Sequence, residues 1–223
     1  MDKTNEKIKV LIADDHPVTR AGITTILEEA PDIEVVGEAR DGAEAKEMVM
    51  AHQPDVLLLD LIMPGLRPYR VEKWVRVNCP ETVTLVLTAH DRDCFLSKAI
   101  EAKVAGYLTK DEAPQKLISA VRRAARGDVL LTPSQVDQAK RWHQAVGQRW
   151  EDLTQRERQV LRLLVQGKSN AAICQALSVT LKTAEYHVTN ILTKLSVTSR
   201  QEAISWVHEH LPESLWDDSD DED

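Results

Sequence analysis

Short apolar runs alternate with segments of helical spacing along the first part of the chain. The apolar runs lie at 8–13, 33–38, 55–59, 82–88 and 105–109. Their β-branched and leucine content is typical of strands buried on both faces, and helical segments fill the gaps and close with 112–126. This alternation predicts an α/β doubly wound domain over 1–127, with a five-stranded parallel sheet covered by helices.

After the last of these helices, the chain shows helical spacing only, with no further strand-like runs. Gly127 is placed to end the helix before it, and Thr132-Pro133 begins a stretch of helical spacing that reaches about Trp150. We interpret 128–150 as a helical linker. Its apolar stripe needs a covering surface, so an interaction role is also open.

Four short helices are predicted in the next segment, 151–212. A capping box, Thr154-x-x-Glu157, precedes the first helix, and a tight connection joins the second to the third. This arrangement is the outline of an all-α helix-turn-helix domain. The residues expected to cap the four helices are Thr154, Ser169, Thr180 and Ser199.

The formal charge of −8 changes this picture only when its distribution is considered. Residues 151–212 hold seven Lys or Arg against six Asp or Glu, whereas 213–223 hold seven acids and no base. The overall charge therefore does not exclude nucleic-acid binding by the helical domain. Two interpretations of the tail are open: a solvated, disordered end, or a competitor of DNA phosphates for Lys182 and Lys194.

Composition excludes several other classes of protein. No apolar stretch approaches the length of a membrane helix, and the first residues lack the apolar core of a signal peptide. We therefore expect a cytoplasmic protein without membrane contact. The cysteines, Cys79, Cys94 and Cys174, are widely spaced, which favours small core residues over a disulfide framework or a zinc site.

Five polar residues stand at or just past the ends of the predicted strands: Asp14, Asp15, Asp60, Thr88 and Lys110. In a parallel sheet the carboxyl ends of the strands converge on one crevice, where ligands bind. Three acids, a hydroxyl and an ammonium should therefore meet at one rim. That combination is suited to handling a phosphoryl group.

The stretches ADDHPVTRAGI, LLLDLIMPG, LVLTAH and GYLTKD resemble the receiver domain of bacterial two-component response regulators. The resemblance implies a flavodoxin-like strand order. It also implies that Asp60 accepts a phosphoryl group from a phosphohistidine of a sensor histidine kinase, with Mg²⁺ as the cofactor. The residues implied to hold Mg²⁺ are Asp14, Asp15, Asp60 and the backbone carbonyl of Ile62; those implied to bind phosphate or to switch are Lys110, Thr88 and Tyr107.

Residues 153–204 resemble the LuxR/NarL-type helix-turn-helix, so the whole chain resembles a NarL/FixJ-family response regulator. The resemblance implies a phosphorylation-controlled transcription regulator, not a metabolic enzyme, whose receiver promotes its own phosphoryl transfer and slow dephosphorylation. An active homodimer would bind paired half-sites on double-stranded DNA through a helix at 181–195. RNA polymerase is a further candidate partner. The expected DNA contacts are Lys182, Thr183, Tyr186, Thr189, Asn190 and Lys194.

The recognition segment departs from its relatives at Glu185, where many members carry lysine. An acid there repels phosphates, so we expect weak non-specific affinity. We expect His187, at apolar helical spacing, to be a core histidine with its hydrogen bonds satisfied. For Ile204, Val207 and Leu211 of the last helix, a dimer contact and a place in the core of the domain are equally open.

Two alternative functions place other demands on the sequence. An aspartate-phosphoenzyme phosphatase of the haloacid dehalogenase type needs a second acid two residues after the nucleophile, and Ile62 stands there. A phosphorylation-independent regulator, or a protein-interaction scaffold with weak DNA binding, remains the alternative. Glu185 and the acidic tail are the features that keep it open.

Overall fold

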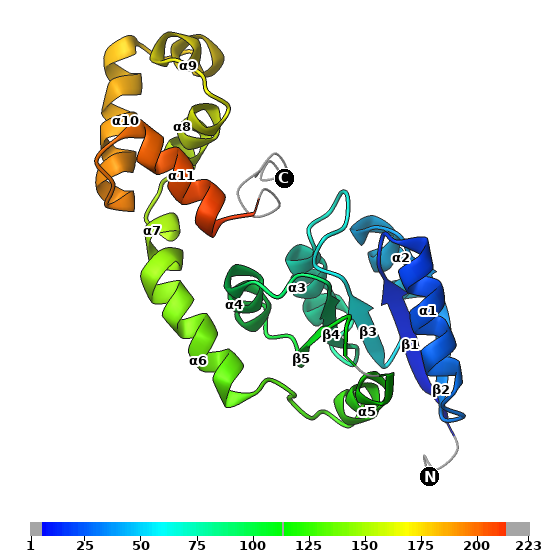
Figure 1. The fold of residues 1–223 in the computed structure, drawn as a ribbon. Coiled ribbons are helices and arrows are strands. Elements are labelled where there is room, and N and C mark those ends of the chain that lie inside the picture. Colours follow the sequence, from blue (N-terminus) through cyan, green and yellow to red (C-terminus); the bar gives the residue numbers. More distant parts are fainter. Residues whose placement is uncertain (1–5, 113, 213–223) are drawn as a thin grey trace. The chain divides into compact units, whose positions relative to one another are not determined.

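The computed structural model describes residues 6–112 and 114–212 (Figure 1). The chain divides into two compact units between Ala139 and Lys140. The acidic tail, 213–223, lies outside the described residues, and so do both interpretations of it.

The first unit is built on a five-stranded parallel sheet with the order β2-β1-β3-β4-β5. This confirms the predicted doubly wound fold and its flavodoxin-like strand order. The observed strands lie within a residue or so of the predicted runs. They are β1 (Ile8–Ala13), β2 (Ile33–Ala39), β3 (Val56–Leu59), β4 (Val83–Thr88) and β5 (Gly106–Thr109).

Helices cover both faces of this sheet because its strands alternate their side chains between two apolar cores. Val10 and Ile12 of β1 pack into one core with α1 and α5, whereas Leu11 and Ala13 pack into the other with α2 and α3 (Figure 1). Apolar side chains fill both faces of the sheet, so the polar groups that follow the strands lie at its carboxyl edge. The helices are α1 (Pro17–Glu28), α2 (Gly42–His52), α3 (Pro68–Asn78), α4 (Asp93–Glu101) and α5 (Pro114–Ala124).

The chain after α5 runs along the free edge of β5. Gly127 has φ of +87° where the helix ends, as predicted, and the Leu130 backbone N then donates to the Ala105 carbonyl at 2.6 Å. Gly106 permits this approach, because a Cβ there would lie 2.9 Å from the Leu85 side chain and 3.1 Å from that of Leu130. The edge strand is therefore covered by the chain's own next segment.

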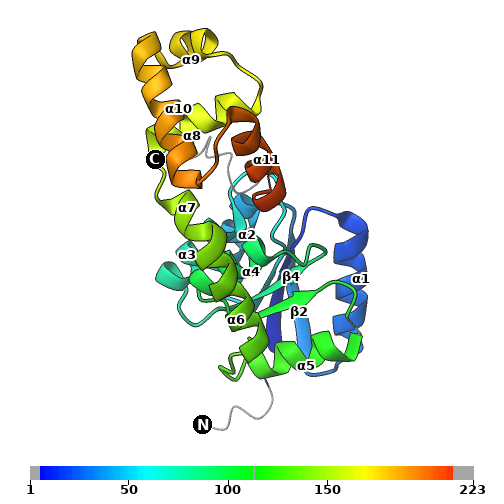
Figure 2. The same cartoon turned by 60° about the vertical axis from the view of Figure 1, so that its left-hand side comes forward.

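Helical residues then run without a break through the stretch predicted as a linker. They form α6 (Pro133–Trp142), a π-helical turn (His143–Gly147) and α7 (Gln148–Glu151) (Figure 2). The first part of α6 belongs to the first unit, and the rest of this stretch belongs to the second unit.

The second unit contains the four predicted helices around one apolar core. The capping box of Thr154 and Glu157 is formed, and Ser169, Thr180 and Ser199 each accept a backbone N–H at the start of their helices. Core residues come from each helix, among them Leu164, Ile173, Ile191 and Trp206. The helices are α8 (Gln155–Val165), α9 (Asn170–Leu177), α10 (Leu181–Leu195) and α11 (Arg200–His210).

The core also decides between the two interpretations of the last helix. Val207 and Leu211 are 1% and 2% exposed and pack with their own unit, so both are core residues. Ile204 is half-buried. No helix in the described part of the chain is long and apolar enough to cross a membrane.

Candidate functional site

The polar residues predicted to converge at the strand ends do meet at the carboxyl edge of the sheet. Asp14 follows β1 and Asp60 follows β3, and they are 1% and 4% exposed. The Lys110 ammonium, just past β5, lies 2.6 Å from Asp14 Oδ2 and 2.6 Å from Asp60 Oδ2. One cation is therefore shared by two buried carboxylates that come from different strands.

Burial and charge act in opposite directions on these groups. Burial raises the pKa of the Asp60 carboxyl, and the hydrogen bond and charge of Lys110 offset only part of that effect. Burial alone would lower the pKa of Lys110, but the carboxylates of Asp14 and Asp60 outweigh it, so the pKa of Lys110 is raised. The ammonium stays protonated, and the site holds more negative charge than one lysine neutralises.

The donor atoms at this edge fit a hard divalent cation. Ligand atoms of Asp14, Asp15, His16 and Asp60 all lie within 4.8 Å of one another. Carboxylate oxygens are the ligands that Mg²⁺ prefers. The backbone N of Ile62 donates to Asp60 Oδ1 at 3.4 Å, which keeps this predicted ligand residue beside the acceptor.

His16 takes a larger part than the sequence suggested. Its side chain is 66% exposed, but its Nδ1 lies 2.7 Å from Asp15 Oδ1. Its backbone N also donates to Asp14 Oδ1 at 2.8 Å. The residue therefore holds the acidic pair in position through both its backbone and its ring.

Thr88 and Tyr107 are linked through the backbone of His90. Thr88 is fully buried at the end of β4, and its Oγ1 accepts a hydrogen bond from the His90 backbone N at 3.1 Å. The Tyr107 hydroxyl donates to the His90 carbonyl at 3.0 Å, and its ring is 4% exposed. The Tyr107 side chain, which the resemblance implies to take part in a switch, therefore faces inward.

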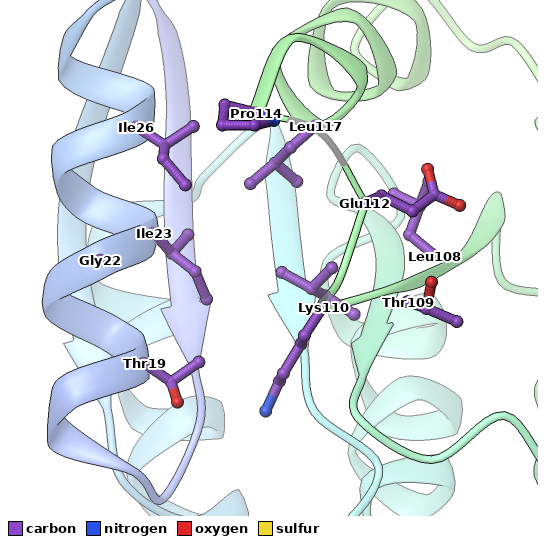
Figure 3. A pocket seen from close by; sticks show the side chains of 11 residues that line it. Thr19, Gly22, Ile23, Ile26, Leu108, Thr109, Lys110, Glu112, Pro114 and Leu117 are labelled. Carbon is purple, nitrogen blue, oxygen red and sulfur yellow. The ribbon is translucent and has the colours of Figure 1, made fainter.

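An apolar pocket of about 190 Å³ opens beside Lys110, between α1 and α5. Ile23 and Ile26 of α1 face Leu117 of α5 across it, and the Lys110 side chain runs along one end (Figure 3). Its ammonium points away from these apolar groups, toward the two carboxylates. The pocket and the acidic site therefore share one residue and lie next to each other.

The second unit presents a polar helix face in α10. Lys182, Glu185, Tyr186 and Thr189 are exposed, as predicted, and Asn190 is half-buried. Tyr186 is 63% exposed, an unusual exposure for a large aromatic side chain in a folded domain. An exposed polar and aromatic face on the second helix of a helix-turn-helix is suited to entering the major groove.

Comparison with known proteins agrees with both units. The family model described as "Response regulator receiver domain" matches residues 10–122, and that described as "Bacterial regulatory proteins, luxR family" matches 151–207. The response regulator protein VraR of Staphylococcus aureus (strain Mu3 / ATCC 700698) is 34% identical over 203 residues, which cover 91% of this chain and 97% of VraR. This chain belongs to the NarL/LuxR family of response regulators.

Solved structures support the same assignment. The receiver domain of the putative response regulator NarL from Mycobacterium tuberculosis is 40% identical, covers 55% of this chain and 99% of its own, and gives a TM-score of 0.53. The two-component response regulator RcsB in a complex with DNA is 25% identical over 91% of this chain and 98% of its own, with a TM-score of 0.58. As a two-component response regulator, this protein acts as a transcription factor rather than a metabolic enzyme.

Two of the DNA contacts predicted for this response regulator are engaged within the protein. Lys194 Nζ lies 2.7 Å from Oε2 of Glu157, the buried capping acid of α8. The Thr183 hydroxyl lies 2.8 Å from that of Thr180, the N-cap of α10. Sequence reasoning found Glu157 as a cap but missed its partner, because the two residues are 37 positions apart.

His187 also differs from the expectation. We predicted a core histidine with its hydrogen bonds satisfied. The residue is half-buried, and its buried Nδ1 has no hydrogen-bond partner within the described ranges. Its ring instead lies 5.9 Å from that of Tyr186, centroid to centroid. The residue is therefore less deeply buried than its spacing predicts, and spacing could not predict its partners.

Proposed function

We propose that this regulator is controlled by phosphorylation of Asp60, with a sensor histidine kinase as the donor. The observation that carries the proposal is the shared ammonium: Lys110 lies 2.6 Å from the carboxylates of both Asp14 and Asp60. A carboxylate can attack a phosphoryl group only where the repulsion between their charges is offset. Lys110 supplies one such charge, and it can move from carboxylate to phosphate oxygen.

The positions of these groups support a direct transfer of the phosphoryl group. An oxygen of Asp60 attacks the phosphorus of the phosphohistidine, the phosphorus–nitrogen bond breaks, and the ring nitrogen of the donor keeps the bonding electrons and takes a proton. Asp14, Asp15, Asp60 and the Ile62 carbonyl are the proposed ligands of Mg²⁺, which when bound neutralises charge on the phosphoryl oxygens. Lys110 then holds a phosphate oxygen of the acyl phosphate.

The pocket between α1 and α5 is the proposed docking site for the kinase. Its apolar lining opens directly beside Lys110, so a partner helix seated there would bring its phosphohistidine to the acidic edge. Ile23 and Leu117 would contact the apolar side of that helix (Figure 3).

The signal would leave the site through β4 and β5. Thr88 gives up the His90 N–H to bond the acyl phosphate, and His90 is also the acceptor for Tyr107. The Tyr107 carbonyl in turn accepts a hydrogen bond from Gln135 Nε2 in α6 at 3.1 Å. Gln138 of α6 donates to Asp93 of α4 at 2.6 Å, so the start of α6 is fastened to both elements. A shift of β5 would therefore move the start of α6.

The output we propose is a dimer that binds paired half-sites, with α10 in the major groove. Lys182 and Thr183 at the start of α10 would face a phosphate, and Tyr186, Thr189 and Asn190 would meet base edges. Lys194 would contact DNA only after leaving Glu157.

The second candidate is a regulator that does not need the phosphoryl group. One observation favours it: the Tyr107 ring is buried and its hydroxyl donates to the His90 carbonyl, so the chain itself stabilises the inward position. Under this alternative the protein would bind DNA equally well with and without modification of Asp60.

Intact-mass measurement after incubation with acetyl phosphate and Mg²⁺ tests the proposal. The wild type should gain the mass of one phosphoryl group and Asp60→Asn should gain none. Asp55→Asn, which changes an acid at the opposite end of β3, should still be labelled. Equal labelling of wild type and Asp60→Asn would contradict Asp60 as the acceptor.

A further inference from the structure

One side of α10 carries a ridge of three exposed residues, Glu185, Thr189 and Thr193, at successive intervals of four. Residues at this spacing lie above one another on a helix and face the same way. The Glu185 carboxylate forms no hydrogen bond or ion pair with any residue in the described part of the chain. Its exposure and lack of partners leave it available to a bound molecule.

The hydroxyl groups of the two threonines of this ridge already donate hydrogen bonds within the helix. Thr189 Oγ1 donates to the Glu185 carbonyl at 3.0 Å, and Thr193 Oγ1 donates to the Thr189 carbonyl at 3.1 Å. A carbonyl can only accept, so in both bonds the threonine must be the donor. The ridge therefore offers hydrogen-bond acceptors and methyl groups to a partner, and no donor.

This chemistry selects among the edges of the base pairs in the major groove. Guanine presents two acceptors there, N7 and O6, which would face acceptors of the ridge and be disfavoured. Adenine presents an amino group beside the N7 acceptor, so a carboxylate would meet one favourable and one repulsive group. Cytosine presents its N4 amino group with no acceptor on the same base, and thymine presents a methyl group.

We propose that Glu185 is a specificity-determining residue that accepts a hydrogen bond from the N4 amino group of a cytosine in each half-site. Thr189 and Thr193 extend the same preference with methyl contacts to thymine. The proposal rests on the DNA contacts of α10 proposed above. It differs from simple repulsion by a solvated acid, because repulsion weakens binding to every sequence equally.

The experiment is selection of bound duplexes from a randomised library by the full-length protein with beryllofluoride and Mg²⁺, followed by sequencing and by anisotropy titrations of the selected duplex. The variants are Glu185→Ala and Glu185→Gln. Asp152→Asn is the control, since it removes an exposed acid of the same unit that lies outside α10. Circular dichroism checks that each variant retains its helices.

The wild type should require cytosine at one position of the half-site, with a discrimination of roughly tenfold over other bases. Glu185→Ala should lose that preference while binding other sequences more tightly. Glu185→Gln should shift the position toward adenine, because a carboxamide can both donate to N7 and accept from N6. Asp152→Asn should leave the selected sequence unchanged.

An unchanged selected sequence in both Glu185 variants, with affinity raised equally for all duplexes, would overturn the role of Glu185 and leave the other α10 contacts standing. A wild type that selects no sequence would contradict the proposed base contacts of α10 and Glu185 together. The two failures are therefore distinguishable.

Discussion

The acidic edge of the receiver and the exposed face of α10 use charged residues in opposite ways. Lys110 is held by two buried carboxylates at 2.6 Å, so its position is set before any ligand arrives. Lys182 and Glu185 of α10 are exposed and have no side-chain partner among the described residues. A site for a small, highly charged group needs preorganised charge, whereas a surface that reads DNA gets its partners only in the complex.

One residue of the receiver and one residue of α10 do not follow this difference. Glu72 of the receiver is 5% exposed, yet burial outweighs the charge of Arg76 and raises the pKa of its carboxyl. Lys194 belongs to α10, yet it is paired with the buried Glu157. These two exceptions give the sharpest ways to test the comparison.

The largest effect is expected from Lys110→Met. It leaves Asp14 and Asp60 buried together without their shared cation, which should lower the free energy of unfolding of the receiver by about 3–5 kcal/mol. Mg²⁺ should restore part of the loss, because it can replace the missing charge. Urea unfolding with and without Mg²⁺ measures both effects.

Lys116→Met is the matched control for this experiment, because Lys116 lies 3.7 Å from Glu112 in an exposed pair. Such pairs contribute little, so its stability should change by less than about 1 kcal/mol. Equal losses in the two variants would mean that Lys110 is not the charge that holds the acidic edge together.

A smaller, pH-dependent effect is expected from Glu72→Gln. Burial raises the pKa of Glu72 from 4.5 to about 7, and Thr84 and Arg76 offset only part of this. Between these pH values the folded protein keeps a proton that the unfolded chain has released, so the free energy of unfolding should fall as pH rises through this window. The variant cannot titrate there, and above pH 7 it should be more stable than the wild type, by at most about 3 kcal/mol.

Urea unfolding at pH 5 and pH 8 measures this difference. Glu47→Gln is the control, since Glu47 is exposed on α2. An unchanged pH dependence in Glu72→Gln would show that Glu72 is ionised in the folded protein.

The smallest effects are expected from substitutions of two lysines of α10, one of which should change stability and the other DNA binding. Lys194→Met removes the partner of the buried Glu157 and should lower the stability of the second unit by about 1 kcal/mol. Lys182→Met should leave stability unchanged and reduce the salt dependence of DNA binding by roughly one unit of slope. Thermal unfolding and DNA titrations over a range of salt concentrations measure the two quantities. A stability loss in Lys182→Met alone would reverse the assignment.

The sequence predicted the acidic edge well because its geometry depends on the sheet. Once 8–13, 55–59 and 105–109 are parallel strands, Asp14, Asp60 and Lys110 must share one rim. The helix caps were equally predictable, since Thr154 and Glu157 interact within a single turn. In both cases local chemistry or strand topology alone fixes the contact.

Contacts between helices were less predictable, because spacing gives the depth of a residue but not its partner. Helical spacing could not tell whether Val207 and Leu211 pack within the unit or against a second copy. It also placed Lys194 on the surface of α10 without revealing Glu157 across the helix interface. The same limit applies to Tyr107, whose inward rotamer depends on the backbone of His90.

In the proposed function, phosphorylation of Asp60 drives a change of assembly. Light scattering of the full-length protein, with and without beryllofluoride and Mg²⁺ as a phosphoryl mimic, tests it most directly in the wild type and in Asp60→Asn. We expect a dimer that needs both reagents and appears only in the wild type. The same mass for both proteins under all conditions would contradict the claim and favour the phosphorylation-independent regulator.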